Sequence, residues 1–194
     1  MNELHIDSVP AALREQLARD WQEIGEALEP AAREELGARL GVDAALGTAL
    51  ARVLCASQFV AQSLQREPAL LVELLASGDL GRGYADGEYA ARIARELPAD
   101  ADEAALHAVL RRLRRREMVR IIWRDLTRAA ELDGTTRDLT HLAEAAVDAA
   151  LAHGHAEHVA RHGEPRGRAS GAPQRMVVLG MGKLGAWELN LSSD

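Results

Sequence analysis

The chain has 194 residues, of which 47% are hydrophobic and 27% are charged, and its formal net charge is −7. This composition is typical of a soluble cytoplasmic protein, and nothing in it indicates binding to a membrane or to nucleic acid. The sequence has no run of about 18 uncharged apolar residues, and its first residues lack the basic start and apolar core of a signal peptide, so we expect neither a transmembrane helix nor a leader.

Apolar residues recur at helical spacing through residues 1–162, and we predict an all-α domain over this range. The first predicted helix carries a stripe of apolar residues three and four positions apart: Leu13, Leu17, Trp21, Ile24 and Leu28. Ser8 is its predicted N-cap, and Pro30 is predicted to open the following helix.

The next helices follow from the same kind of spacing. One apolar stripe comprises Leu46, Leu50, Val53 and Leu54. Pro68 is predicted to start a short helix that ends before a loop marked by Gly78, Gly81, Gly83 and Gly87. The single cysteine, Cys55, cannot form an internal disulfide, and its apolar neighbours predict a small core residue rather than a nucleophile.

A long helix is predicted near residues 102–131, with an arginine at every fourth position: Arg112, Arg116, Arg120, Arg124 and Arg128. This basic ridge has two interpretations: it binds phosphate or an acidic partner, or it is a solvated face paired with some of the chain's 30 acidic residues. Several apolar residues on the same helix, among them Ile122 and Trp123, also indicate burial.

A further helix is predicted to start at a capping-box-like signal, Thr135-x-x-Asp138, and to carry an apolar stripe from Leu139 to Leu151. Its end is rich in histidine, with His158 and His162 one turn apart. Two imidazoles at this spacing can share a metal ion, but no further ligand completes a set, so we favour a polar helix end near the C-terminal dipole.

Residues 163–173 are dense in glycine and proline and are predicted to be a linker between the helical domain and residues 174–194. Residues 176–179 form an apolar run that predicts a buried strand without most of its sheet. We expect this last segment to be poorly ordered or to pack on the helices.

The predicted strand leads into a glycine turn, Gly180-Met181-Gly182-Lys183-Leu184-Gly185. Glycines let backbone amides approach an anion closely, and Lys183 adds positive charge, so the turn is a candidate phosphate site. The spacing also fits a dinucleotide-binding turn, although the acidic residue required about twenty positions later is not in the sequence. A Walker A loop is excluded because Leu184 follows the lysine, and a tight turn without a ligand stays open.

The segment from this turn to Asp194 resembles one family as a unit, through Gly-Met-Gly-Lys-Leu-Gly-x-x-Glu-Leu-x-x-Ser-Ser-Asp. It is similar to the glutamine synthetase adenylyltransferase/adenylyl-removing enzymes. The arginine-rich residues 110–126 resemble the helix that precedes the first catalytic domain of that family, and a weaker likeness reaches back to Phe59 and Pro68. The resemblance implies a mainly α chain: a helical domain followed by the truncated start of an α/β nucleotidyltransferase domain of the DNA polymerase β type.

The resemblance also implies a reaction and a site. Because the glycine turn lies near residue 180 with no earlier catalytic signature, it matches the half that removes AMP: phosphate attacks adenylyl-tyrosine of glutamine synthetase and gives ADP. Asp194 then falls on the first carboxylate of a metal pair that holds Mg²⁺, with Ser193 beside it, and Gly180, Gly182, Lys183 and Gly185 contact nucleotide phosphate. Arg120 or Arg124 is expected to brace this domain.

The second carboxylate of the pair is not in the sequence, and one carboxylate is a poor magnesium site. We therefore expect this chain to be an N-terminal fragment that is inactive alone. An alternative is a non-catalytic helical module that binds glutamine synthetase or a PII-type signalling protein. A dinucleotide-binding oxidoreductase would explain the three glycines, but it leaves the continuation to Asp194 and the arginine helix without a role.

Overall fold

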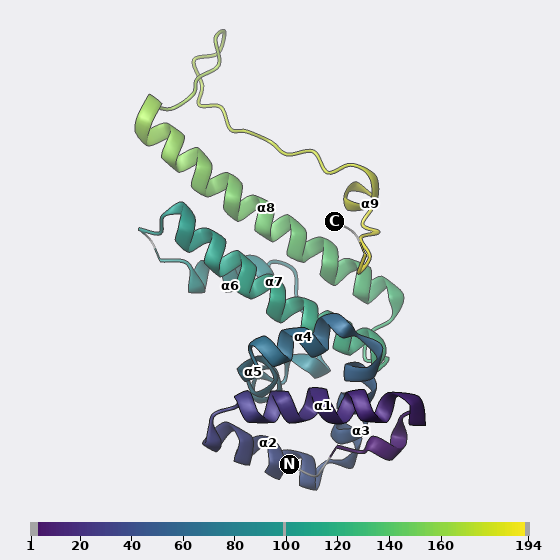
Figure 1. Ribbon diagram of the computed structural model, residues 1–194. Helices are drawn as coiled ribbons and strands as arrows, with labels where there is room; N and C mark the ends of the chain where they lie inside the picture. The colour runs from purple at the N-terminus through teal and green to yellow at the C-terminus, as the bar shows by residue number, and fades with distance from the viewer. Residues whose placement is uncertain (1–3, 99, 193–194) are drawn as a thin grey trace. The chain divides into compact units, whose positions relative to one another are not determined.

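The computed structural model describes residues 4–98 and 100–192, and helices account for most of them (Figure 1). No strand forms within these described ranges, and the predicted mainly α class is confirmed. The elements in chain order are η1 Ile6–Ser8, α1 Ala11–Ala27, α2 Pro30–Val42, α3 Ala44–Ala56, α4 Gln58–Arg66, α5 Ala69–Ser77, η2 Asp79–Gly81, α6 Glu88–Glu96, α7 Glu103–Leu126, α8 Leu132–His162 and α9 Gly182–Gly185.

The chain divides into two compact units. Unit 1 comprises Met1–Gly83 and Arg115–Thr135, and unit 2 comprises Tyr84–Arg114 and Thr136–Asp194. Both α7 and α8 therefore contribute residues to each unit. This division does not test the predicted boundaries at residues 162 and 174, which stay predictions.

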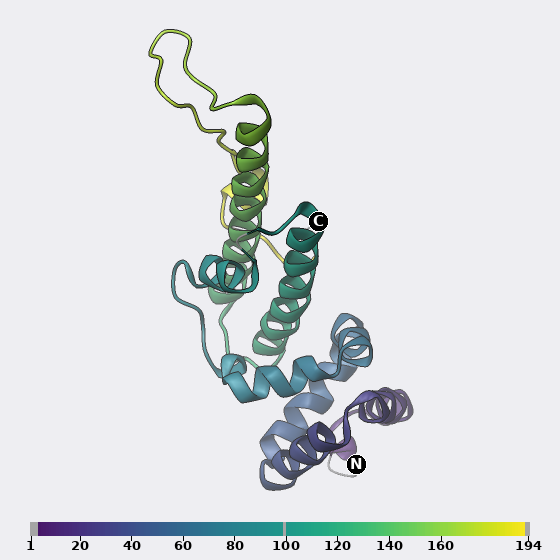
Figure 2. The same cartoon turned by 90° about the vertical axis from the view of Figure 1, so that its left-hand side faces the viewer.

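In unit 1, α1 packs against α3 and α4, and α3 also packs against α2 (Figures 1 and 2). The apolar stripes that predicted these helices form the core between them. Leu17, Trp21 and Ile24 of α1 are buried, as are Leu50 and Leu54 of α3. Leu13 departs from the prediction: its side chain is 41% exposed, because it lies at the edge of the stripe.

The ends of these helices follow local side-chain chemistry. Asp43 Oδ1 accepts a hydrogen bond from Leu46 N at 2.9 Å and caps α3, and Ser57 Oγ accepts from Val60 N at 3.3 Å and caps α4. The predicted helix start at Pro30 is confirmed. The predicted cap at Ser8 is wrong, because Ser8 lies in η1 and its hydroxyl donates to the His5 carbonyl, while α1 begins later, after Pro10.

The short helix predicted after Pro68 is also present, as α5. It ends at Gly78, whose φ of 71° is left-handed and suits glycine. No single helix in the described part of the chain is both long and apolar enough to cross a bilayer, although α3 and α4 reach that length and apolarity together across a bend of 107°.

Unit 2 holds α6 against α8 through a buried hydrogen bond, in which Tyr89 OH donates to Asp138 Oδ1 at 3.0 Å. The predicted capping box at Thr135 is wrong, because α8 already begins at Leu132. Thr135 instead donates through Oγ1 to Asp125 Oδ1 at 3.2 Å, within unit 1. Both polar residues of the predicted box thus serve tertiary contacts.

The glycine- and proline-rich residues 163–173 turn back on themselves, and Arg166 and Pro173 form an isolated antiparallel bridge. Residues 176–179 then run extended along α8, but they form no strand, because no other described segment provides a ladder of hydrogen bonds (Figure 1). The strand prediction is therefore wrong. The expected packing on a helix is confirmed further along, where the rings of Trp187 and of His141 of α8 lie edge to face with centroids 5.1 Å apart. Residues 176–179 themselves are 53–82% exposed.

Candidate functional site

The glycine turn is a single helical turn, α9, entered from the extended residues 176–180. Gly182 has a φ of 57°, in the left-handed region that other residues rarely adopt. A Cβ at Gly185 would collide with the carbonyl oxygen of Gly180 and lie 2.9 Å from its carbonyl carbon. Two of the predicted glycines are therefore required by backbone geometry, one by its dihedral angle and one by close approach.

Gly180, Gly182, Lys183 and Gly185 lie within one turn of the chain, and their contact with nucleotide phosphate stays a prediction. The turn is closed by backbone hydrogen bonds from Ala186 N to Gly182 O at 2.9 Å and from Glu188 N to Lys183 O at 2.8 Å. Lys183, the one lysine of the sequence, is exposed, and no acidic side chain in the described ranges lies within ion-pair distance of it. The turn thus presents a free ammonium group beside exposed backbone.

The other two predicted site residues, Ser193 and Asp194, lie outside the described residues. The predicted metal site at Asp194 and the predicted role of Ser193 therefore stay predictions. Within the described ranges, no group of three or more His, Cys, Asp or Glu side chains could hold a metal ion. His158 and His162 stack with ring centroids 5.9 Å apart at the end of α8.

The middle of the arginine ridge of α7 is buried, whereas Arg112 is exposed and pairs with Glu96 at 3.4 Å. Arg116, Arg120 and Arg124 are 2%, 0% and 7% exposed, respectively. Arg116 pairs with Glu73 at 2.6 Å, with Asp79 at 2.7 Å and with the neighbouring Glu117. The predicted pairing with acidic residues is therefore confirmed for Arg116, and so is the burial that the apolar residues of this helix indicated. The predicted solvated face is wrong for these three arginines, because they lie in the core of unit 1.

The next arginines bind backbone carbonyls. Arg120 Nη2 donates to Arg82 O at 3.3 Å, and Arg124 Nη2 donates to Ala129 O at 3.2 Å. These contacts hold the segments on either side of α7 within unit 1, and the expected brace between Arg120 or Arg124 and the nucleotidyltransferase domain stays a prediction. Arg128 lies beyond the end of α7 with a φ of 60°, so it does not extend the ridge.

Sequence reasoning missed Asp79 and Glu73 as partners of α7. Asp79 is buried and accepts from Arg82 Nη2 at 2.8 Å as well as from Arg116. The sequence feature that could have indicated this role is an acidic residue directly after Gly78, in a segment whose glycines predict an exposed loop. Such a residue has no helical periodicity, so only the tertiary fold reveals its partner.

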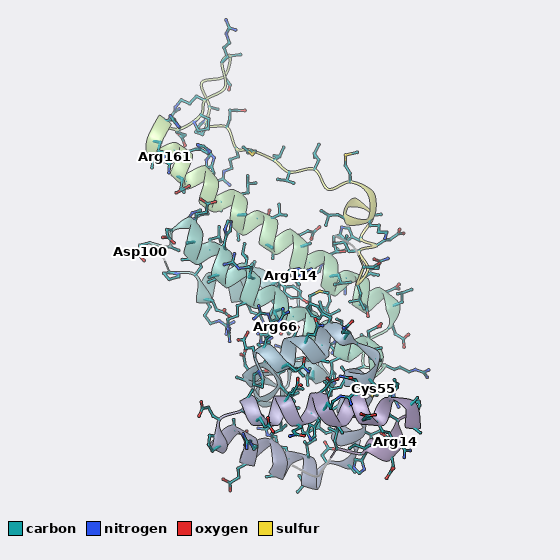
Figure 3. The ribbon with its side chains drawn as sticks, in the orientation of Figure 1. Arg14, Cys55, Arg66, Asp100, Arg114 and Arg161 are labelled. Atoms are coloured by element: carbon teal, nitrogen blue, oxygen red, sulfur yellow. The ribbon has the colours of Figure 1, made fainter. Side chains whose placement is uncertain are left out.

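Cys55 lies on α3 in unit 1 and is half-buried (Figure 3). Burial raises the pKa of its thiol above the ordinary value, and the negative charge of Asp20 raises it further. A raised thiol pKa lowers the thiolate fraction at neutral pH, which supports the prediction that Cys55 is not a nucleophile.

Comparison with known proteins agrees with the resemblance seen in the sequence. The model of a family described as glutamate-ammonia ligase adenylyltransferase matches residues 47–194. The bifunctional glutamine synthetase adenylyltransferase/adenylyl-removing enzyme of Pseudomonas putida is 55% identical over 143 residues, which cover 74% of this chain and 15% of that enzyme. The enzyme of the same name from Nitrosococcus oceani is 44% identical, over 98% of this chain and 19% of its own length.

A third relative of the same name, from Pseudomonas syringae pv. tomato, is 45% identical over 95% of this chain and 19% of its own length. The chain thus spans less than a fifth of the length of these curated relatives. The family match includes α7 and the whole glycine turn. The chain therefore belongs to the glutamate-ammonia ligase adenylyltransferase family.

Proposed function

We propose that this chain forms the helical region and the first nucleotide-contacting turn of the deadenylylating half of an enzyme that controls glutamine synthetase by reversible adenylylation. Family membership and the names of the relatives support the link to glutamine synthetase. The order of segments supports the choice of half. The arginine-rich α7 precedes the glycine turn, as the resembling helix precedes the first catalytic domain of the family.

The proposed reaction is phosphorolysis of the adenylyl-tyrosine bond. An oxygen of inorganic phosphate attacks the phosphorus of the AMP group, and the bond from phosphorus to the tyrosine oxygen breaks. The products are ADP and unmodified glutamine synthetase, whose tyrosine oxygen takes up a proton. ATP, ADP and phosphate are accordingly the proposed small-molecule partners, and a PII-type protein is a proposed regulator. We place the protein in the cytoplasm with its proposed substrate.

One observation carries the proposed role of the turn: a Cβ at Gly185 has no room beside the Gly180 carbonyl. The backbone folds back on itself at Gly180 and Gly185, and the absence of a Cβ at Gly182 lets an anion approach the amides at the start of the turn. Lys183 is exposed beside these amides and supplies a positive charge. We therefore assign Gly180, Gly182, Lys183 and Gly185 to the phosphate groups of the nucleotide.

The described turn offers N–H donors and an ammonium group, which suit phosphate oxygens and do not ligate metal ions. Mg²⁺ would neutralise the charge of the transferred phosphoryl group when bound. We propose that Asp194 helps to hold this ion and that Ser193 lies beside the phosphates, which leaves the turn residues with the nucleotide alone. Because the chain contains one carboxylate of the pair, we expect it to bind nucleotide without turnover.

Lys183 provides a direct test, because it is the one lysine of the sequence. Acetylation of its amine by a succinimidyl ester is followed by mass spectrometry with and without ADP, and the N-terminal amine of the same molecule serves as the control. Protection by ADP of Lys183 alone supports the proposal. Equal modification of both amines at every ADP concentration contradicts it.

The alternative is a helical module that binds glutamine synthetase or a PII-type protein without contacting nucleotide, and the predominance of helices among the described residues favours it. A capture assay with adenylylated glutamine synthetase separates the two, using the double variant Lys183→Ala, Gly185→Ala. If the chain is only a binding module, the variant still captures adenylylated glutamine synthetase, and the amount captured does not change when ADP is added. Metal-dependent release of ADP by the unmodified chain alone would contradict the expected lack of turnover.

A further inference from the structure

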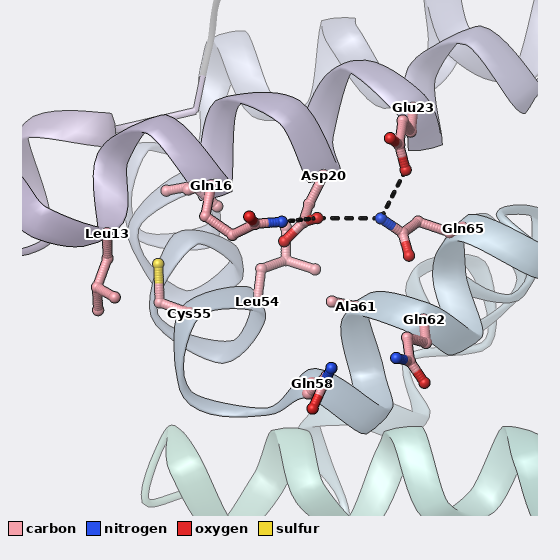
Figure 4. A pocket seen from close by; sticks show the side chains of 11 residues that line it. Leu13, Gln16, Asp20, Glu23, Leu54, Cys55, Gln58, Ala61, Gln62 and Gln65 are labelled. Atoms are coloured by element: carbon pink, nitrogen blue, oxygen red, sulfur yellow. Dashed lines mark hydrogen bonds between the residues drawn. The ribbon is translucent and has the colours of Figure 1, made fainter.

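A polar cleft in unit 1 lies apart from the glycine turn and has no role in the proposed reaction. Residues of α1, α3 and α4 line it, and its volume is about 440 Å³ (Figure 4). Cavities of roughly 300–1,000 Å³ are typical of small-molecule sites. The lining is unusual for such a site, because four glutamines and two carboxylates contribute to it: Gln16, Gln58, Gln62, Gln65, Asp20 and Glu23.

Asp20 is the buried acceptor of this cleft, and its side chain extends from α1 toward α4 (Figure 4). The residue is 8% exposed. Its Oδ1 accepts a hydrogen bond from Gln16 Nε2 at 2.7 Å and another from Gln65 Nε2 at 3.0 Å. Its Oδ2 accepts none from the part of the chain that the structure describes. One oxygen of a buried carboxylate is therefore available to a ligand.

The charge of the cleft is uncompensated by its own lining. Asp20 and Glu23 carry negative charge, and no lysine, arginine or histidine is among the lining residues. The two donors to Asp20 are neutral amides, so no cation of the lining offsets its charge, and Oδ2 is not one of the buried atoms without a hydrogen bond, so it is open to solvent and to a ligand. The pKa of Cys55, which also lines the cleft, is raised first by burial and then by Asp20, so this negative charge acts across the cleft.

The remaining amides complete the site. Gln58 and Gln62 line the cleft from α4, and neither makes a hydrogen bond with another described side chain or backbone group. Each amide can donate and accept, which suits a polar tail on a ligand. A divalent metal ion is a poor occupant, because no group of three metal-binding side chains forms in the described ranges.

We propose that the cleft between α1 and α4 binds a small organic cation, whose ammonium or guanidinium group pairs with Asp20 Oδ2 and whose polar remainder contacts Gln58 and Gln62. The volume fits a small molecule, the negative charge of the lining attracts a cation, and the free amides suit a ligand with hydrogen-bonding groups. This site is independent of the proposed nucleotide turn, so the failure of either proposal leaves the other intact.

The test uses the folded 194-residue chain labelled with ¹⁵N, with nuclear magnetic resonance of the glutamine side-chain amides as the readout. The probes are 1,4-diaminobutane and agmatine, and the control is 1,4-butanediol, which replaces both ammonium groups by hydroxyls. Saturable shifts with either cation and none with the diol are expected. A saturable response to neither cation up to ~10 mM, or an equal response to the diol, overturns the proposal.

Variants locate the binding. Asp20→Asn keeps the shape and removes the charge, so affinity for the cation should fall at least about tenfold. Glu15→Gln removes a charge from the exposed part of the same helix, outside the cleft, and should change affinity less than about twofold. Gln62→Ala should weaken binding by a smaller factor than Asp20→Asn. Circular dichroism confirms that each variant is folded, and equal affinities for Asp20→Asn and Glu15→Gln would also overturn the proposal.

Discussion

The arginine helix and the glycine turn are the two segments whose sequences most suggest a ligand site, and the structure uses their polar groups in opposite ways. The charges of Arg116 and Arg120 lie inside unit 1 beside Glu73, Asp79 and Glu117. The ammonium group of Lys183 lies at the surface of a turn. Both segments carry positive charge, yet one lies in the core of unit 1 and the other is exposed to a ligand. What separates them is the presence of acidic partners elsewhere in the fold, which local sequence does not reveal.

The largest expected effect tests the structural half of this comparison. Arg116→Ala removes one of the cations beside the buried acids Asp79 and Glu117, which keep Arg82 and Arg120 respectively, so the free energy of unfolding should fall by about 3–5 kcal/mol. Arg115→Ala is the control on the same helix, because Arg115 forms a partly exposed pair with Glu67. Its removal should lower the free energy of unfolding by less than about 1 kcal/mol. Urea titration measures both, and equal losses would show that the buried pairs do not stabilise unit 1.

Gly185→Ala tests the other half. A methyl group cannot fit against the Gly180 carbonyl, so the turn must open and the protection of Lys183 by ADP should weaken by at least about tenfold. The free energy of unfolding of unit 1 should stay within about 0.5 kcal/mol, because the turn belongs to unit 2. Unchanged protection in this variant would remove the turn from the nucleotide site.

Gly154→Ala provides a contrast to Gly185→Ala, because a methyl group has room at this position. Gly154 lies within α8, and a Cβ there meets no atom within 4 Å. Alanine has a higher helix propensity than glycine, so this change should stabilise the chain by about 0.5–1 kcal/mol. Thermal unfolding followed by circular dichroism measures the difference. A loss of stability would show that the open space at Gly154 is needed.

The smallest effect concerns Cys55. Its reaction with iodoacetamide requires the thiolate, and the raised pKa should move the midpoint of the rate–pH profile above that of a free cysteine. Asp20→Asn removes the weaker of the two causes, so the midpoint should move down but stay above that of free cysteine. Glu15→Gln should leave the profile unchanged, and a shift equal to that of Asp20→Asn would exclude a local effect of Asp20.

Sequence reasoning succeeded where local physics decides the outcome. Helical spacing placed Leu17, Ile24 and Leu50 in the core, and the fixed φ of Pro30 marked a helix start. It failed where distant residues compete for the same group. Asp138 was predicted to cap a helix but accepts from Tyr89, 49 positions away in sequence.

In the candidate site, too, the features set by neighbouring residues were predictable, and those set by distant residues were not. The glycines of the turn were recognisable because their backbone geometry depends on close neighbours, as Gly180 and Gly185 show. The run 176–179 reads as a strand from its apolar residues, but a strand also needs a pairing partner that these residues do not specify. The polar cleft was missed because Asp20 and Gln65 lie on different helices and meet only in the folded chain.

The buried ion pairs of α7 also constrain how this family can diverge. Loss of Arg116 alone removes one cation from each of two buried acids, and loss of Asp79 alone removes one acid from Arg116 and from Arg82, so each single step should destabilise unit 1. Joint replacement of the whole set by apolar residues of similar volume carries no such penalty. Homologous chains should therefore keep Arg116, Asp79 and Glu117 together or lack all three, and these positions should covary more strongly than the exposed arginines on the same helix.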